Sequence, residues 1–271
     1  MSWINGFVMS VGMFSIIPVP HKSWNDKYMP MVIPAMPFVG LLIGLVWYGS
    51  AYLLSISAAP ATIQGAITLF IPLVLCGFIH ADGYMDTADA VFSRRGADDK
   101  RRILKDPHTG AFAVVAIAGL LIIQFCSVYE IMDARRALTS FIYIPVMSRC
   151  VAGAAMLNMK PMFDTGFCAM FKKGARRGHK VFIYVTASAC VAAVLLTAFA
   201  PLLTSEAPSV APGLSVTAAL LAALAPILVT ALAGIAAMAY LYRQFDGVSG
   251  DLCGCAITVG EFAGLLCAAL I

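Results

Sequence analysis

The sequence predicts an all-α integral membrane protein, a polytopic helical bundle of about seven transmembrane helices. Hydrophobic residues make up 61% of its 271 residues and charged residues only 12%, whereas an ordinary soluble domain has about 25% charged residues. The apolar runs are continuous, and they are about twice as long as the ten-residue alternating strands of a membrane β-barrel. Residues 1–271 are therefore expected to form a single membrane domain.

The N-terminal segment, residues 1–36, is expected to stand apart from the spans. Its apolar part runs from Trp3 to Ile17 and contains Asn5 and Gly12. A length of about 15 residues is short for a membrane span. We expect this segment to lie in the membrane interface or to tuck between the helices as a re-entrant element.

Seven later runs have the length and the apolar character of spanning helices. In chain order they are Pro37–Ser57, Ala61–Ile79, Ala111–Met132, Leu138–Leu157, Val181–Leu203, Leu214–Tyr242 and Gly254–Ile271.

The positions of Lys and Arg predict how these spans are oriented. With seven spans and a cytoplasmic N-terminus, 15 of the 18 basic residues fall on the cytoplasmic side, in residues 1–36, 80–110, 158–180 and 243–253. Short cytoplasmic loops retain positive charge. The sequence therefore predicts a multi-pass protein of a prokaryotic plasma (inner) membrane, with the lipid bilayer as a partner. No nucleic-acid partner is expected, and self-association is left open.

The segment Gly77–Phe112 is far more polar than its surroundings, with six Asp, six Lys or Arg and two His. In a helix Asp82, Asp86 and Asp89, at i, i+4 and i+7, fall within about 60° of one another. Carboxylates this close raise one another's pKa unless a cation lies among them. Oxygen ligands suit a hard divalent ion, Mg²⁺ before Ca²⁺.

A solvated acidic face is the simpler alternative, and Asp106 before Pro107 is equally a candidate N-cap of the next helix. Two observations favour the metal. No base separates Asp82 from Asp89, while six bases follow, a layout that a metal and a polyphosphate would share. A second acidic segment, "RQFDGVSGDLCG", lies on the same predicted membrane side.

This second segment, residues 243–253 with Gly254, is predicted to be a glycine-rich loop. Asp246 and Asp251 would supply further carboxylates to a metal, while Gly247 and Gly250 would let the backbone approach an anion closely. A plain interhelical turn is the alternative.

The run "HADGYMDTADAVFSRRGADDKRRILKDPHTGAF" resembles the signature of the adenosylcobinamide-GDP ribazoletransferase (cobalamin synthase) family, His-x-Asp-Gly-x-x-Asp-x-x-Asp-Gly followed by Lys-Asp-x-x-x-Gly. The resemblance extends to "IIPVP" and "MPFVGLLIG" near the N-terminus and to "GVSGDLCGCAITVGE" near the C-terminus. Three positions depart from the family pattern: Ala90 replaces Gly, His108 replaces Arg, and Asp246 stands where Gly is common.

The resemblance implies a Mg²⁺-dependent transferase of late cobalamin (vitamin B12) biosynthesis. Such an enzyme joins adenosylcobinamide-GDP to α-ribazole or its 5′-phosphate and releases GMP. On this interpretation Asp82, Asp86 and Asp89 ligate Mg²⁺, and Asp251 and Asp246 complete the site or hold a second ion. Lys105 and His108 contact the diphosphate, and either His80 or an acid left free by the metal takes the hydroxyl proton.

Arg149 and Glu261 fall inside predicted spans, where ionisable groups are costly and usually paired or functional. Either the two residues form an ion pair, or Arg149 reaches a substrate phosphate near the cytoplasmic end of its helix.

Two other functional classes are alternatives to this assignment. A lipid-synthesising CDP-alcohol phosphotransferase would carry Asp-Gly-x-x-Ala-Arg, but Tyr84, Met85, Asp86 and Thr87 follow Asp82-Gly83 here. A divalent cation transporter should place acids at the bilayer midplane on several spans. In this sequence nearly all acids fall in loops or at helix ends, and Glu261 is the main exception.

Overall fold

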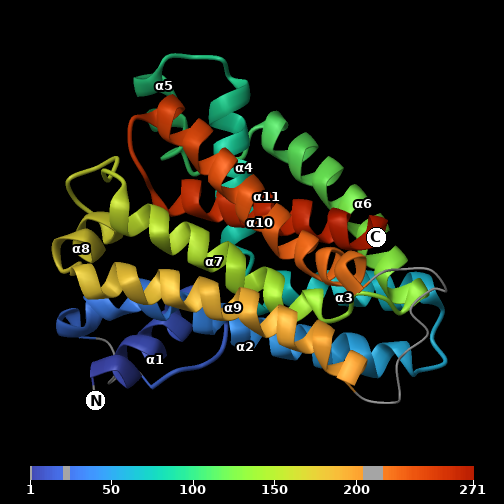
Figure 1. The fold of residues 1–271 in the computed structure, drawn as a ribbon. Coiled ribbons are helices and arrows are strands. Elements are labelled where there is room, and N and C mark those ends of the chain that lie inside the picture. The colour runs from blue at the N-terminus through green and yellow to red at the C-terminus, as the bar shows by residue number, and fades with distance from the viewer. Residues whose placement is uncertain (1, 21–24, 204–215) are drawn as a thin grey trace.

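A computed structural model describes residues 2–20, 25–203 and 216–271 of the chain. This part of the chain is built from helices and contains no strand (Figure 1). The elements in order are α1 (Ser2–Phe14), the short 3-10 helix η2 (Asp26–Tyr28), α2 (Met29–Ser55), α3 (Ala61–Leu75), α4 (Ile79–Phe92), α5 (Ala97–Ile103), α6 (Ala111–Ala134), α7 (Ser140–Asn158), α8 (Phe167–Lys173), α9 (Arg177–Leu203), α10 (Val216–Phe245) and α11 (Gly250–Leu270).

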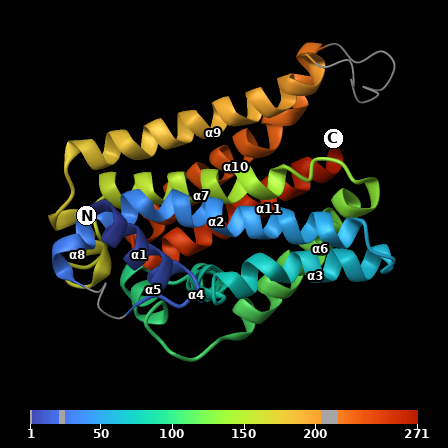
Figure 2. The same cartoon turned by 90° about the horizontal axis from the view of Figure 1, so that it is seen from below.

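Six of these helices, α2, α6, α7, α9, α10 and α11, are long and apolar enough to cross a membrane. The pair α3 and α4 passes the same test only when joined, and its two halves are bent by 87°. Counting that pair once gives seven spans, which confirms the predicted all-α polytopic bundle. Figure 2 shows α9 on one flank of the bundle, α3 and α6 on the other, and α2, α7 and α11 between them.

The centre of the bundle is the contact between α2 and α7. A Cβ added at Gly40 would lie 2.5 Å from the Pro145 carbonyl oxygen, and one at Gly44 would lie 2.6 Å from that of Ile142. Small residues let membrane helices approach closely and gain packing contacts. Further along α2, Trp47 stacks on Phe141 with ring centroids 4.6 Å apart. These contacts make α7 a buried scaffold for the helices around it.

The N-terminal region differs from the predicted one at its boundary. Helix α1 packs against α2, where Gly6 leaves room only for the side chain of Met31. Helix α2 begins at Met29, before the predicted start at Pro37, and residues 29–36 belong to it rather than to an interfacial segment. Pro30 lies in the first helical turn, where a backbone N–H would have no intrahelical acceptor, so it fits there without cost.

The predicted span Ala61–Ile79 is wrong at its end, because α3 stops at Leu75. Gly77 and Phe78 both have φ of 60°, in the left-handed region, and they turn the chain into α4. Mean hydropathy shows how long an apolar run is, but not whether the chain changes direction within it. It therefore could not predict the bend. The acidic stripe therefore lies on α4, beyond the bend, and α4 by itself is not one of the six helices long and apolar enough to cross a membrane.

The segments predicted to share one membrane side gather at one end of the bundle. The N-terminus, α5, α8 and the turn from α10 to α11 lie at that end, while the C-terminus and the connections α2–α3 and α6–α7 lie at the other (Figures 1 and 2). Lys22 and the predicted outer loop Thr204–Gly213 lie outside the described residues. In the described part of the chain these segments thus lie at one end of the bundle, and the membrane side that this end faces stays a prediction.

Candidate functional site

Helix α4 presents the predicted acidic stripe. Asp82 is exposed, and Asp86 and Asp89 are half-buried, on one side of a continuous 14-residue helix. The neighbouring face of the helix, which includes His80, Gly83, Thr87 and Ala90, is buried against the bundle. Spacing alone was sufficient to predict that the three acids share a helix face.

The crossing of α4 with α11 brings Asp251 beside this stripe. A Cβ added at Gly83 would lie 2.7 Å from the carbonyl oxygen of Asp251 and 2.9 Å from its Cα, so the two backbones touch at that point. The Thr258 hydroxyl of α11 donates a hydrogen bond of 3.0 Å to the His80 carbonyl oxygen of α4. Glycine at position 83 therefore sets the distance between the two acidic segments.

Helix α11 starts earlier than predicted, so Asp251 lies in its first turn and not in a loop. The Ser249 hydroxyl caps the helix by accepting the Leu252 N–H at 3.3 Å. Since α10 continues to Phe245, only residues 246–249 connect the two helices, and the predicted loop 243–253 is too long. A carboxylate in the first turn interacts favourably with the helix dipole, which helps to hold Asp251 there.

The Asp86 carboxyl is perturbed by its burial and by its neighbours. Partial burial raises the pKa of Asp86 to about 6, and the carboxylates of Asp82, Asp251 and Asp89, in that order, add to the effect. No basic side chain offsets this repulsion at Asp86. A cluster of this kind is stabilised by a bound cation or by a proton.

The donor chemistry of Asp82, Asp86 and Asp251 suits Mg²⁺, because all the available ligands are carboxylate oxygens. As the side chains stand, however, no three His, Cys, Asp or Glu groups among the described residues are placed to hold one ion together. The residue types fit a hard cation, and enclosing one requires the carboxylates of α4 and α11 to rotate toward each other.

Asp89 has a structural role that the sequence did not reveal. Its two carboxylate oxygens accept the backbone N–H groups of Gly110 at 2.6 Å and Ala113 at 2.9 Å. These bonds cap the N-terminus of α6 from a different helix, which satisfies donors that no intrahelical group can reach. The assignment of Asp89 as a metal ligand stays a prediction.

Asp106 is not the N-cap of the next helix, because α6 begins only at Ala111 after the cap residue Gly110. Asp106 instead accepts the His108 N–H at 3.0 Å and pairs with the His108 Nδ1 at 2.8 Å. These bonds lower the pKa of Asp106. The His108 side chain is 90% exposed and lies at the surface.

Asp246 forms an ion pair of its own and does not join the acids of α4 and α11. Its carboxylate lies 3.6 Å from Arg101, whose Nε donates to the Phe245 carbonyl oxygen at 2.8 Å. Next to this pair, Lys100 of α5 donates to the side chain of Gln244. Asp246 and the basic residues of α5 therefore join α5 to the end of α10, and the structure gives no support to Asp246 as a ligand beside Asp86.

The two predicted anion-binding glycines have different surroundings. Gly247 packs directly against the backbone of Met162, and the adjacent Val248 exchanges backbone hydrogen bonds of 2.9 Å with Lys160 and Met162. Gly247 thus serves a close chain contact. Gly250 has no neighbouring atom within 4 Å of an added Cβ, so its backbone faces open space.

A cavity of about 590 Å³ adjoins the acids. His80, Lys105, Ser249 and Asp251 contribute polar groups to its wall, and most of the remaining lining is apolar. His80 is only 9% exposed, and its Nε2 has no hydrogen-bond partner among the described residues. A buried polar atom without a partner is unusual, and this one is enclosed, with less than 1 Å² of accessible surface.

Arg149 forms an ion pair inside the bundle. It is 1% exposed, and it donates to the carboxylate of Glu261, to the Pro145 carbonyl oxygen at 3.1 Å and to the Cys76 Sγ at 3.3 Å. The Ser148 hydroxyl also donates to Glu261, at 2.9 Å. Of the two arrangements considered from the sequence, the ion pair is the one that the structure contains. A phosphate contact of Arg149 finds no support in it.

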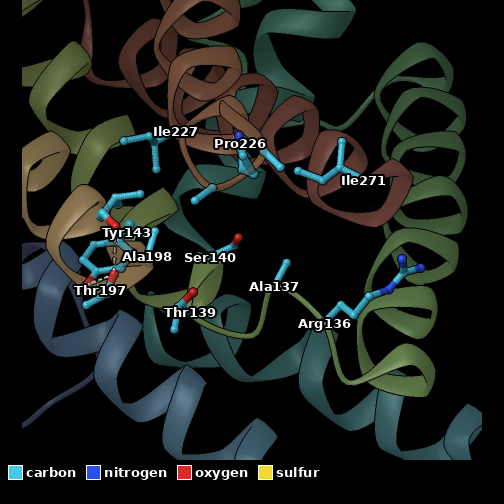
Figure 3. A pocket seen from close by; sticks show the side chains of 13 residues that line it. Arg136, Ala137, Thr139, Ser140, Tyr143, Thr197, Ala198, Pro226, Ile227 and Ile271 are labelled. Carbon is cyan, nitrogen blue, oxygen red and sulfur yellow. Dashed lines mark hydrogen bonds between the residues drawn. The ribbon is translucent and has the colours of Figure 1, made fainter. Parts of the chain in front are cut away.

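A second cavity, of about 280 Å³, lies near the opposite end of the bundle between α7, α9, α10 and the C-terminus (Figure 3). Tyr143 and Thr197 approach each other there, with a hydrogen bond of 3.5 Å between their hydroxyls. Its lining includes Arg136 but no Asp, Glu or His. Among its described lining residues there is therefore no side-chain carboxylate for a metal.

Comparison with known proteins gives a consistent result. Residues 6–269 match the family model described as cobalamin-5-phosphate synthase. Three curated relatives are each named adenosylcobinamide-GDP ribazoletransferase. That of Clostridium perfringens (strain SM101 / Type A) is 29% identical over 266 residues, covering 97% of this chain and 96% of the relative. Those of Geobacillus thermodenitrificans and Geobacillus kaustophilus are 31% and 32% identical, each covering 95% of this chain and 92% of the relative. No solved structure shows significant similarity.

Proposed function

The chain belongs to the cobalamin-5-phosphate synthase family, and we propose that it carries out the family reaction with Mg²⁺ at the crossing of α4 and α11. As a family member it is a transferase of cobalamin biosynthesis that joins adenosylcobinamide-GDP to ribazole. The proposal adds the metal, the residues that hold it, and α-ribazole or its 5′-phosphate as the acceptor.

One observation carries the proposal. Asp82 and Asp251 are near enough to Asp86 to raise its pKa, and Asp251 lines a cavity whose wall also includes His80 and Lys105. Acids, a base and a cation from segments far apart in sequence are thus brought to one place. A divalent cation transporter would distribute acids along its spans. Here Glu261, the acid deep in the bundle, is already paired with Arg149.

The reaction assigns a task to each of these groups. A ribose hydroxyl of the acceptor attacks the phosphorus nearer the cobinamide, the bond from that phosphorus to the bridging oxygen breaks, and GMP leaves with the electron pair. When bound, Mg²⁺ supplies charge stabilisation for the diphosphate. Asp82, Asp86 and Asp251 would hold it, and Asp89 would contribute through the lone pairs that capping leaves free.

The remaining groups act on the substrates directly. The Nε2 of His80 has no protein partner, so we assign it to accept the proton of the attacking hydroxyl. Lys105 lies on the same cavity wall and contacts the diphosphate, with His108 as a second contact at the surface. The end of the bundle that holds these groups is assigned to the cytoplasmic side of a prokaryotic inner membrane, because the basic segments gather there.

A direct test uses the purified protein in lipid vesicles with Mg²⁺, GDP-activated cobinamide and either α-ribazole or its 5′-phosphate. We expect GMP to appear in equal amount with the joined corrinoid product, as measured by mass spectrometry. A CDP-activated lipid alcohol in place of the cobinamide should yield no CMP. If folded protein releases no GMP with either acceptor, the proposed function is wrong.

A further inference from the structure

We propose that the cavity of about 590 Å³ binds the base and ribose of the acceptor riboside, and that the guanine nucleotide and the corrin ring lie outside it. This inference rests on the proposed function. It concerns which substrate occupies which part of the site, and it follows from the walls of the cavity.

The cavity joins two walls of different character. Its polar groups include His80 from α4 and Ser249 and Asp251 at the start of α11, while its aromatic rings are Phe14 of α1 and Phe163, Phe167 and Phe171. The rings of Phe167 and Phe171 are stacked at 21° to each other with centroids 6.2 Å apart. Flat aromatic ligands pack well against ring pairs of this kind.

The chemistry of the lining selects between the two nucleoside-like groups that the reaction brings together. A benzimidazole base has an apolar, methylated edge that needs no hydrogen-bond partner, whereas guanine presents an amide and an amino group. None of the described lining residues is Asn or Gln, and the single carboxylate, Asp251, already belongs to the acids around Asp86. A guanine group buried there without a hydrogen-bond partner would weaken binding.

Size gives the same answer. A volume of about 590 Å³ lies within the range of roughly 300–1,000 Å³ that is typical of pockets for small ligands. A benzimidazole riboside is a ligand of this size, while a corrin macrocycle with its side chains and adenosyl group is several times larger. The corrinoid must therefore meet the site from outside the cavity.

The position of the polar wall fixes the direction of the riboside. With its base against Phe167 and Phe171, the ribose is left toward His80 and Asp251, where a hydroxyl must lose its proton. Lys105 Nζ lies 3.7 Å from the centroid of the Phe163 ring, so a cation is held on the aromatic wall of the same cavity. The attacking hydroxyl, the base that accepts its proton and a charge for the phosphate are thus brought together.

The test compares the Michaelis constants of the two substrates. Phe167 is 54% exposed, so Phe167→Ala removes the aromatic surface without opening the core. We expect the KM for the riboside to rise about tenfold, the loss expected for about 1.4 kcal/mol of contact. The KM for GDP-activated cobinamide should stay within about twofold. Phe70→Ala is the matched control, because Phe70 is 50% exposed on α3 and does not line this cavity.

A second variant and a binding measurement make the result independent of turnover. Cys168→Phe adds bulk to the cavity wall and should weaken the riboside in the same selective way. Isothermal titration of α-ribazole alone into the protein in detergent should show saturable binding, weakened by Phe167→Ala and unchanged by Phe70→Ala.

Different results distinguish a failure of this inference from a failure of the proposed function on which it rests. If Phe167→Ala raises the KM of GDP-activated cobinamide and leaves that of the riboside unchanged, the cavity holds the nucleotide and the inference is overturned. If the riboside binds and Phe167→Ala weakens it, but no GMP is formed from any substrate pair, the cavity assignment stands and the proposed function fails.

Discussion

Asp89 is one of three acids that the sequence placed on a single helix face, and that placement is confirmed. The cap that it gives to α6 was not predictable, because it joins positions 21 and 24 residues apart in sequence across two helices. The same holds for Asp246, whose partner Arg101 is distant in the chain. Local spacing predicts which side chains share a face, and tertiary contact decides what those side chains meet.

Substitutions at Asp89 separate capping from metal binding. Asp89→Ala should lower the free energy of unfolding by about 1–2 kcal/mol, since the Gly110 and Ala113 N–H groups lose their acceptor. Asp89→Asn keeps one acceptor oxygen and should cost less stability, but as a ligand variant it should release GMP more slowly. Thermal unfolding in detergent and the GMP assay measure the two effects. Asp89→Ala with wild-type stability would contradict the cap.

At the scale of elements, the sequence located the spanning helices correctly but not the bend that creates the site. Hydropathy merges α3 with the start of α4, because Leu75 to Ile79 are apolar apart from Gly77. The turn depends on left-handed backbone at Gly77 and Phe78, and Phe78 is a residue type that rarely adopts it. The early start of α11 was not predicted either, because a glycine-rich run is typical of a loop.

The close approach of α4 and α11 makes Gly83 a sensitive position. Gly83→Ala would place a methyl group 2.7 Å from the Asp251 carbonyl oxygen and force the helices apart. We expect a loss of about 1–3 kcal/mol of stability, as for other overpacked sites, together with a fall in the rate of GMP release. Gly119→Ala in α6 is the matched control, because nothing lies within 4 Å of its added Cβ. That control should be neutral or gain about 0.5–1 kcal/mol. Equal behaviour of the two variants would exclude the proposed contact.

At the scale of the whole molecule, the distribution of Lys and Arg correctly predicted which segments share an end of the bundle. The two termini lie at opposite ends of the bundle, which fits the count of seven candidate spans that includes the bent pair of α3 and α4 (Figure 2). Charge counts succeed here because retention of basic loops acts on the whole topology and not on any single contact. They do not reveal the cavity, whose lining comes from segments spread between Gly12 and Ile257.

The membrane orientation can be tested by cysteine labelling in a variant without native cysteines. Asp98 in α5 and Lys173 in α8 are exposed, and both helices lie at the end that carries the site; Ser57 is exposed in the α2–α3 connection, which lies at the other end. A membrane-impermeant reagent should modify Asp98→Cys and Lys173→Cys from the cytoplasmic side and Ser57→Cys from the opposite side. Labelling of Asp98→Cys and Lys173→Cys from different sides would contradict the prediction that their segments share one membrane side.

The central claim is that the carboxylates at the crossing of α4 and α11 hold the metal that makes GMP a leaving group. The most direct measurement is the rate of GMP release against Mg²⁺ concentration for Asp86→Asn, with Asp98→Asn as control because Asp98 is an exposed partner of Arg101. We predict that Asp86→Asn stays folded, loses roughly 100- to 1,000-fold in rate, as for loss of an electrostatic contact in other active sites, and needs more Mg²⁺. Asp98→Asn should keep most of its activity. Normal turnover of Asp86→Asn at low Mg²⁺ would contradict the account.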